Sequence, residues 1–423
     1  SVTSDKSNSI RSVLLASQAI GTSKIYNLLE SEDVINSLIS IKKLGVKYKK
    51  FKSYYQINGF GLNGYNIKKD IVIDAGNSGT LARLILGLLI DTKKKITLIG
   101  DNSLSRRDFS RVVKPLRLFG ANINSNNNKL PVSITGTDFL RPIKYYEKIG
   151  SAQCKSAVML AAIKTPGITK IKAKKSRNHT ELLFKYLKIP ILIKKKKNFD
   201  LIEIRGQSNF NGFNYKIPGD ISSCSFFLVL TLLTKNSKLI LKNININNSR
   251  TGVIKILNKM NANITFKNKK NYKGELIADI IVKSNKNLIG INCPRKLNSS
   301  AIDEFLIIFL AAAKARGISK FTNLGELNNK ESPRLDIATD FLKKIGIKFV
   351  RHKDNLKIYG NPNIELSGNY VIKNFKKDHR VFMMSCIASL TFGGKWKIHD
   401  KDSIKTSFPT FLQKIKYLGA KIN

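Results

Sequence analysis

The sequence has few cysteines, histidines and acidic residues and no long apolar run, and each shortage excludes a class of protein. The four cysteines (Cys154, Cys224, Cys293 and Cys386) form no CxxC pair, so we expect reduced thiols in a cytoplasmic protein. The four histidines form no HExxH-like cluster, and we expect no metal site. No apolar run reaches the roughly 18–20 residues that span a bilayer. The chain begins at Ser1 without an initiator Met or a signal-peptide core, which leaves room for residues before it.

The shortage of acidic residues makes the chain strongly basic. It has 75 Lys and Arg against 28 Asp and Glu, a net charge of +47. A polyanionic partner would explain this charge, and so would a general bias toward Lys, Asn and Ile, which are abundant together. We favour the bias for the bulk charge, because much of the lysine lies in solvent-type runs. The 423 residues, 42% of them hydrophobic, are enough for two globular domains with full cores.

One stretch, residues 74–83, has the composition of an anion-binding turn. The β-branched residues 71–73 predict a strand before it, and the apolar residues 84–90 predict a buried helix after it. Two glycines and small polar residues between them suit a tight turn whose backbone N–H groups face an anion at a helix N-terminus. Arg83, one turn into the helix, would add a fixed cation. A plain Gly-rich turn is the alternative for this motif taken alone.

The chain repeats this organisation six times. Each copy has an apolar helix, a turn and a β-type run, followed by an amphipathic helix with a Leu–Gly-like stop, as at Leu44–Gly45. The repeats, of roughly 70–85 residues, are too long for a solenoid and suit repeated α/β subdomains. We therefore predict an α/β (α+β) protein of two similar domains, each with three βαβαββ-type units. The domains are expected at residues 5–218 and at 1–4 with 219–423, with the active site in a cleft between them.

Small polar and charged residues recur in the turn before the first helix of each repeat. Singly, each turn fits ordinary helix capping. Together they predict a ligand site with many fixed cations and a few carboxylates, suited to small molecules that carry phosphate and carboxylate groups. Asp303, Glu331 and Asp378 are the candidates for proton transfer. Further basic loops lie at residues 105–107 and 330–334.

In order, these turns resemble the motifs of the 3-phosphoshikimate 1-carboxyvinyltransferase (EPSP synthase) family over essentially the whole chain. The matching segments are Lys6–Arg11, Gly76–Arg83, Ser151–Lys155, Ser176–Glu181, Pro218–Ser223, Ile302–Glu304, Lys330–Arg334 and Asp378–Arg380. The third and fourth segments are similar to those of the glyphosate-tolerant (class II) branch. The resemblance implies an inverted α/β barrel-like enolpyruvyl transferase fold whose two domains close on the substrates.

The resemblance also implies the reaction, in which the enolpyruvyl group of phosphoenolpyruvate moves to the 5-hydroxyl of shikimate 3-phosphate and phosphate is released. This step of the shikimate pathway leads to chorismate and the aromatic amino acids. The implied shikimate 3-phosphate ligands are Lys6, Ser7, Arg11, Ser151, Ala152, Gln153, Asp303 and Lys330. The implied phosphoenolpyruvate ligands are Lys6, Gly79, Arg107, Gln153, Arg334 and Arg380. The implied catalytic residues are Lys6, Asp303, which accepts the hydroxyl proton, and Glu331, which protonates the methylene carbon.

By the same resemblance we expect no cofactor and no metal. We expect the two small-molecule substrates as partners, no membrane or specific nucleic-acid partner, and a monomer. Three departures from the family pattern affect loops: Asp108 replaces a Pro, Pro333 replaces an Asp, and Thr406 aligns with a Lys.

Three other interpretations stay open from the sequence. The first is an enolpyruvyl transferase acting on UDP-N-acetylglucosamine, but that family has Lys-Asn where this chain has Lys6–Ser7, and a Cys or Asp in a mobile loop for which residues 104–109 offer no Cys. The second is a nucleic-acid-binding or RNA-end-processing protein, suggested by the charge. The third is an inactive homologue.

Overall fold

The computed structural model describes residues 2–62, 65–284 and 287–422, and these divide into two compact units. The N-terminal unit comprises residues 4–217 with 273–275. The C-terminal unit comprises residues 2–3, 218–272 and 276–422, apart from 285–286. Among the described residues, no helix is both long and apolar enough to cross a bilayer.

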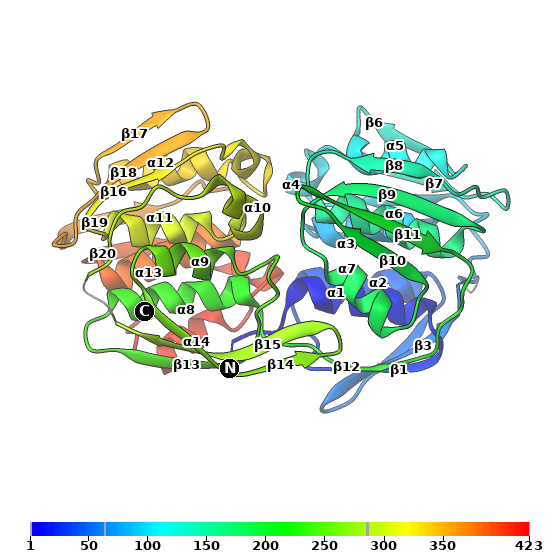
Figure 1. The fold of residues 1–423 in the computed structure, drawn as a ribbon, viewed down its shortest axis with the longest axis horizontal. Helices are drawn as coiled ribbons and strands as arrows, with labels where there is room; N and C mark the ends of the chain where they lie inside the picture. Colours follow the sequence, from blue (N-terminus) through cyan, green and yellow to red (C-terminus); the bar gives the residue numbers. More distant parts are fainter. Residues whose placement is uncertain (1, 63–64, 285–286, 423) are drawn as a thin grey trace. The chain divides into compact units, whose positions relative to one another are not determined.

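The N-terminal unit repeats one pattern of strands and helices (Figure 1). Its inner helices, buried on nearly all sides, are α1 (Lys6–Gln18), α3 (Gly79–Leu88) and α6 (Ala152–Lys164). The remaining helices are α2 (Glu32–Lys43), α4 (Asn102–Ser105), α5 (Ser110–Leu118) and α7 (His179–Tyr186). The strands are β1 (Ile20–Tyr26), β2 (Lys47–Lys50), β3 (Tyr54–Phe60), β4 (Ile71–Asp74), β5 (Ile96–Ile99), β6 (Asn122–Asn126), β7 (Lys129–Thr135), β8 (Lys144–Glu147), β9 (Ile168–Lys174), β10 (Ile191–Lys195), β11 (Phe199–Arg205) and β12 (Asn214–Lys216).

The C-terminal unit follows the same pattern. Its inner helices are α8 (Ile221–Leu233), α11 (Phe305–Ala313) and α13 (His379–Thr391). The remaining helices are α9 (Gly252–Lys259), α10 (Asn298–Ala301), α12 (Arg334–Lys344), α14 (Phe411–Tyr417) and the 3-10 turns η1 (Arg295–Leu297), η2 (Gly325–Asn329) and η3 (Lys401–Thr406). The strands are β13 (Lys238–Asn245), β14 (Asn263–Tyr272), β15 (Glu275–Lys283), β16 (Gly317–Phe321), β17 (Phe349–His352), β18 (Asn355–Gly360), β19 (Leu366–Ile372) and β20 (Gly393–Ile398).

The strand order shows the βαβαββ unit directly. In the sheet β4-β5-β7-β6, the pair β4–β5 is parallel and encloses α3 in sequence, and the other pairs are antiparallel. The sheet β10-β11-β9-β8 repeats this arrangement around α6, and the parallel pair β19–β20 encloses α13. The first sheet, β12-β1-β3-β2, takes its parallel strand β12 from the far end of the unit. The predicted mixed α/β fold built from repeated units is confirmed.

The predicted helix stops are confirmed by the backbone. Gly45, Gly120, Gly346 and Gly419 follow the outer helices α2, α5, α12 and α14 with φ between 71° and 113°. At the equivalent positions after α7 and α9, Lys188 (φ 58°) and Asn261 (φ 67°) adopt the same left-handed conformation. These residues satisfy the C′ position that usually favours glycine.

The inner helices form the core of each unit, and the polar turns lie just before them in the chain. All nine residues of α11 are buried, and the apolar core of the C-terminal unit gathers around α8, α11 and α13. A helix that is apolar on all sides can be stable in water only when it is enclosed in this way. In the chain, α3, α6 and α13 each follow a strand (β4, β8 and β19) through a short turn, whereas α11 follows the short helix α10.

One short segment joins the N-terminal unit from far along the sequence. Glu275, the first residue of β15, is fully buried, and its Oε1 lies 2.5 Å from Nδ1 of His179 at the start of α7. The same oxygen accepts a hydrogen bond from Nδ2 of Asn8 in α1 at 3.4 Å. Glu275 therefore links α1 and α7 in the part of the unit where Lys6 and Arg11 begin the first repeat.

Candidate active site

The turn at residues 75–78 is an N-capped helix start, as its composition predicts. The Oγ of Ser78 accepts a hydrogen bond from the backbone N–H of Leu81 at 3.2 Å, and α3 begins at Gly79. Asp5, Ser151, Asp220 and Asp378 cap α1, α6, α8 and α13 in the same way. These five side chains therefore cap helices, as ordinary capping predicts, and a capping hydroxyl such as that of Ser151 can still form a hydrogen bond with a bound ligand.

Two arginines meet over Gly79. Nη1 of Arg83 donates to the Gly79 carbonyl at 3.2 Å and to Oε1 of Gln153 at 3.0 Å. A Cβ atom on Gly79 would lie 2.8 Å from Nη1 of Arg83 and 2.9 Å from Nη1 of Arg107. The structure therefore brings together three of the predicted phosphoenolpyruvate ligands, Gly79, Arg107 and Gln153, with Arg83 as a fourth member.

Arg83 is a cation in an apolar setting. Its guanidinium lies 4.9 Å from the ring centroid of Phe109, a favourable cation–π arrangement. Burial lowers the pKa of Arg83 to about 10, and the positive charge of Arg107 acts in the same direction. Arg83 still carries its charge at neutral pH, and this charge is only weakly screened by water.

The starts of α1, α6 and α7 converge on Arg11. Its Nε donates to Oγ1 of Thr180 at 2.9 Å and its Nη2 donates to Oγ of Ser156 at 3.2 Å. Its Nη1 donates to the carbonyl of Ser7 at 3.1 Å. These bonds fix the guanidinium beside the first helix turn, next to the start of α6 where Ser151, Ala152 and Gln153 lie.

Lys6, in the first helix, forms an ion pair with Asp33 in the second helix of the same repeat. Its Nζ lies 2.7 Å from Oδ2 of Asp33 in α2, and its side chain is 20% exposed. The remaining exposure leaves the ammonium reachable by an anion, while Asp33 holds it in place. No local sequence signal linked Asp33 to Lys6, which lies 27 residues away.

In the C-terminal unit, one guanidinium contacts three carboxylates. The Arg334 side chain is 1% exposed, and its Nη2 lies 2.5 Å from Oε2 of Glu331. Its Nη1 lies 3.4 Å from Oδ1 of Asp303, and its Nε donates to Oδ2 of Asp378 at 2.9 Å. Nζ of Lys330 lies 3.3 Å from the same Asp303 oxygen. The structure thus brings Asp303, Lys330, Glu331 and Arg334 into one cluster.

The charges of this cluster stabilise one another. Burial opposes the charge on Arg334, but Asp378, Glu331 and Asp303 outweigh it and raise the pKa of the guanidinium above its ordinary value. Burial also opposes the charge on Asp378, but Arg334 outweighs it and lowers the pKa of that carboxyl. Asp378 also accepts bonds from Oγ of Ser332 and from the backbone N–H of Arg380. Its position as a buried, ion-paired cap makes it a structural anion.

Arg380, the second residue of α13, has its guanidinium near a different carboxylate. Its Nη1 lies 3.8 Å from Oε1 of Glu304, the residue next to Asp303. The side chain of Glu304 is fully buried. The sequence analysis noted Asp303 and Glu304 as neighbouring carboxylates. The structure shows that they have different partners, Arg334 for Asp303 and Arg380 for Glu304.

The predicted ligand residues fall into two groups. In the N-terminal unit they are Lys6, Ser7, Arg11, Gly79, Arg107, Ser151, Ala152 and Gln153. In the C-terminal unit they are Asp303, Lys330, Glu331, Arg334 and Arg380. In the described part of the chain, no three His, Cys, Asp or Glu side chains gather as a metal site would require. All four cysteines lie in that part, and each is buried without a disulfide.

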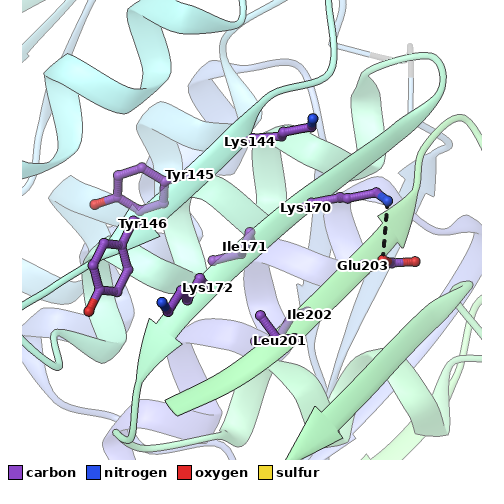
Figure 2. A pocket seen from close by; sticks show the side chains of 9 residues that line it. All are labelled: Lys144, Tyr145, Tyr146, Lys170, Ile171, Lys172, Leu201, Ile202 and Glu203. Atoms are coloured by element: carbon purple, nitrogen blue, oxygen red, sulfur yellow. Dashed lines mark ion pairs between the residues drawn. The ribbon is translucent and has the colours of Figure 1, made fainter.

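A surface hollow lies apart from these clusters (Figure 2). It has a volume of about 380 Å³ on the sheet formed by β8, β9 and β11, where Lys144, Tyr146, Lys170 and Lys172 line it. Nζ of Lys172 lies 4.8 Å from the ring centroid of Tyr146 and 4.6 Å from that of Phe199. None of the predicted ligand residues lines this hollow.

Known proteins match this chain over essentially its whole length. Residues 1–415 match the family model of EPSP synthase (3-phosphoshikimate 1-carboxyvinyltransferase). The 3-phosphoshikimate 1-carboxyvinyltransferase of Ruthia magnifica subsp. Calyptogena magnifica is 40% identical over 100% of this chain and 95% of its own length. That of Zymomonas mobilis subsp. mobilis is 36% identical over 99% of this chain and 93% of its own.

Solved structures agree with this result. The EPSP synthase from Acinetobacter baumannii matches 100% of this chain and 96% of its own, with a TM-score of 0.86 and 35% identity. The enolpyruvyl transferase NikO from Streptomyces tendae, 13% identical, matches the fold with a TM-score of 0.76. With its repeated units, its capped turns and its arginine clusters, the chain belongs to the EPSP synthase (3-phosphoshikimate 1-carboxyvinyltransferase) family.

Proposed function

We propose that this protein transfers the enolpyruvyl group of phosphoenolpyruvate to the 5-hydroxyl of shikimate 3-phosphate and releases phosphate. The family membership supports this reaction, and one observation in the structure carries it. Asp303 and Glu331 lie 3.4 and 2.5 Å from two nitrogens of the same guanidinium, that of Arg334. Two carboxylates fixed around one cation suit a reaction that moves two protons on a highly anionic pair of substrates.

The proposed chemistry is an addition followed by an elimination. Asp303 accepts the proton of the 5-hydroxyl while the oxygen bonds to C2 of phosphoenolpyruvate, and Glu331 gives a proton to the methylene carbon. In the elimination step, the tetrahedral intermediate loses phosphate from C2 while Glu331, now a carboxylate, takes a proton from the new methyl group, which restores the double bond. The arginines stabilise the substrate charges and the departing phosphate.

Arg334 also has a place in the proton transfer to carbon. Its Nη2 donates a hydrogen bond to Oε2 of Glu331. A bound phosphoenolpyruvate carboxylate would give the guanidinium another anion to pair with. Arg334 would then hold Glu331 beside the substrate whose methylene carbon it protonates.

The substrate contacts follow the family motifs. Shikimate 3-phosphate is assigned to Lys6, Ser7, Arg11, Ser151, Ala152, Gln153, Asp303 and Lys330. Phosphoenolpyruvate is assigned to Lys6, Gly79, Arg107, Gln153, Arg334 and Arg380. The cluster around Gly79 supports the second assignment, because Arg107 lies beside a backbone position without a side chain and Gln153 accepts a hydrogen bond from Arg83 at the same position.

Three finer features belong to the proposal. The Ser151–Ala152–Gln153 start of α6 and the segment from Arg177 to Glu181 favour the glyphosate-tolerant branch of the family. The composition favours a cytoplasmic location. The substrates are the partners that we expect, and we expect a monomer.

The direct test is phosphate release by the purified protein. We expect release only when shikimate 3-phosphate and phosphoenolpyruvate are both present. Equal release with UDP-N-acetylglucosamine in place of shikimate 3-phosphate would assign the protein to the sister reaction. No release with either acceptor, from a folded protein, would indicate an inactive homologue.

A further inference from the structure

Glu304 occupies an unusual position in the C-terminal unit. It lies at the N-terminal end of α11, where the other inner helices have Asp220 and Asp378, but its side chain caps no backbone N–H group. The side chain is fully buried, and Oε2 has no hydrogen-bond partner among the described residues. A buried carboxylate is costly unless its charge is matched, so its surroundings need an explanation.

The hydroxyl of Ser222 fixes the other oxygen. Oγ of Ser222, in the first turn of α8, donates to Oε1 of Glu304 through a very short bond. The same Oγ accepts a hydrogen bond from Nη2 of Arg250 at 2.6 Å. This nitrogen also lies 3.1 Å from Oδ1 of Asp220. The hydroxyl therefore donates one hydrogen bond to Glu304 and accepts another from Arg250. These two bonds fix its orientation.

This chain of contacts ends at Arg380. Oε1 of Glu304 lies 3.8 Å from Nη1 of Arg380, whose side chain is 12% exposed. Arg250 and Arg380 supply two positive charges, and Asp220 and Glu304 supply two negative charges. These four charges balance, and the carboxylate of Glu304 connects the starts of α8, α11 and α13.

The distance between Glu304 and Arg380 matters for function. At 3.8 Å the two groups attract each other, but they are farther apart than a hydrogen bond allows. Glu304 thus restrains the guanidinium while its N–H groups stay available to an anionic ligand. A bidentate grip on a carboxylate depends on the orientation of the guanidinium plane, so such a restraint favours ligand binding.

We propose that Glu304 is a positioning residue for Arg380 and thereby sets the affinity for phosphoenolpyruvate. This inference rests on the proposed function, which assigns Arg380 to that substrate. Glu304 itself is buried and acts through Arg380. Removing its charge would lessen the local negative potential, but the loss of the restraint on Arg380 dominates.

The kinetic test is a double-mutant cycle of Glu304→Gln and Arg380→Gln. Glutamine keeps the shape of Glu304 and an acceptor for Ser222 but loses the charge. We expect Glu304→Gln to raise KM for phosphoenolpyruvate at least fivefold and to change KM for shikimate 3-phosphate less than twofold. In the Arg380→Gln background it should have no further effect. An unchanged or lower KM, or an equal effect in both backgrounds, would overturn the proposal.

A second variant tests the same proposal without changing Glu304, in case Glu304→Gln does not fold. Ser222→Ala leaves the charge of Glu304 but removes its orienting bond, so KM for phosphoenolpyruvate should rise by a smaller factor. An unchanged KM in this variant counts against the proposal. Glu365→Gln, at an exposed position of the same unit, is the matched control and should match the unmutated protein.

Measuring the free energy of unfolding tests the coupling of Glu304 to Arg380 independently of the proposed reaction. The one tryptophan of the sequence, Trp396, lies in β20 of the C-terminal unit, so its fluorescence follows the unfolding of that unit. The effects of Glu304→Gln and Arg380→Gln on urea unfolding should be non-additive, because the two residues form one ion pair. Non-additive stability without phosphate release in the unmutated protein would refute the proposed function alone. Additive effects would refute the coupling of Glu304 to Arg380.

Discussion

Asp303 and Glu331 share Arg334, but their other surroundings differ. Asp303 also contacts the ammonium of Lys330 at 3.3 Å, and its side chain is 16% exposed. The side chain of Glu331 is 23% exposed. Two cations therefore lie beside the carboxylate of Asp303, the group proposed to accept the hydroxyl proton. The more exposed Glu331 suits the exchange of a proton with a substrate carbon.

Replacing either carboxylate by its amide removes the proton transfer without a large change in shape. We expect Asp303→Asn and Glu331→Gln each to lower kcat by about 10²–10⁴-fold, the usual contribution of general acid–base catalysis. Phosphate release measures kcat, and circular dichroism shows whether each variant is folded. Asp340→Asn, at an exposed position on α12, is the control. A near-normal rate in either site variant would refute the proton-transfer role of that residue.

Gly79 has no room for a methyl group unless its neighbours move. An added Cβ would come within 2.9 Å of both Arg83 and Arg107, whose flexible ends would have to shift. We expect Gly79→Ala to raise KM for phosphoenolpyruvate severalfold and to weaken inhibition by the bulkier mimic glyphosate by a larger factor. Steady-state inhibition measures both effects. Equal changes for substrate and inhibitor would show that the methyl group does not discriminate between them.

At this scale the sequence predicted the types of site residue better than their partners. The order of the motifs identified Arg11, Gly79, Asp303 and Arg334, because each stands in a recognisable turn. The partners Asp33, Ser156 and Thr180 lie on other helices, and their contacts depend on how those helices pack. Local composition carries no record of such long-range contacts.

The ends of the helices show how far local sequence determines an element. The glycines after α2, α5, α12 and α14 were predicted stops, and all four adopt positive φ. Lys188 and Asn261 occupy the same conformation without being glycine. The repeat indicated these two stops, although residue type did not. The strand β12 was not predicted to complete the first sheet, because its three residues pair with β1 about 190 positions earlier.

The cap of α13 should make the C-terminal unit sensitive to acid. Arg334 outweighs burial and lowers the pKa of Asp378 below its ordinary value of 3.8. Such a carboxyl adds stability above its unfolded pKa and loses this contribution as the pH falls through its folded pKa.

We therefore expect Asp378→Asn to lower the free energy of unfolding at pH 7 by about 3 kcal/mol, the lower end of the cost of breaking a buried ion pair. The lower end applies because Arg334 keeps Asp303 and Glu331 as partners. The difference from the unmutated protein should shrink as the pH falls below 3.8. Urea unfolding followed by Trp396 fluorescence between pH 7 and pH 3 measures this. A difference independent of pH would contradict it.

At the scale of the whole molecule, part of the excess of lysine lies on exposed sheet faces. In β9, Lys170, Lys172 and Lys174 alternate with buried residues and point to solvent. Several lysines lie over aromatic rings of the same chain, as Lys49 does over Phe51 at 5.1 Å. Rings covered in this way are less available for stacking with nucleic-acid bases.

A net charge of +47 still predicts non-specific attraction to polyanions. We expect single-stranded DNA to bind at low salt and to lose about 10³–10⁵-fold in affinity between 50 and 200 mM salt if 6–10 phosphates are contacted. Fluorescence anisotropy with two unrelated sequences measures this. Binding that survives 200 mM salt or distinguishes the two sequences would favour the nucleic-acid interpretation.

The interleaved division of the chain has a consequence for its synthesis on the ribosome. Residues 4–217 emerge first and contain most of the N-terminal unit, but Glu275, the partner of His179, is translated only later. Thr3, whose carbonyl accepts a bond from the backbone of Asp220, belongs to the unit that is made last. Residues 2–3 therefore leave the ribosome before residues 218–422 but can reach their final place only after Asp220 has been made.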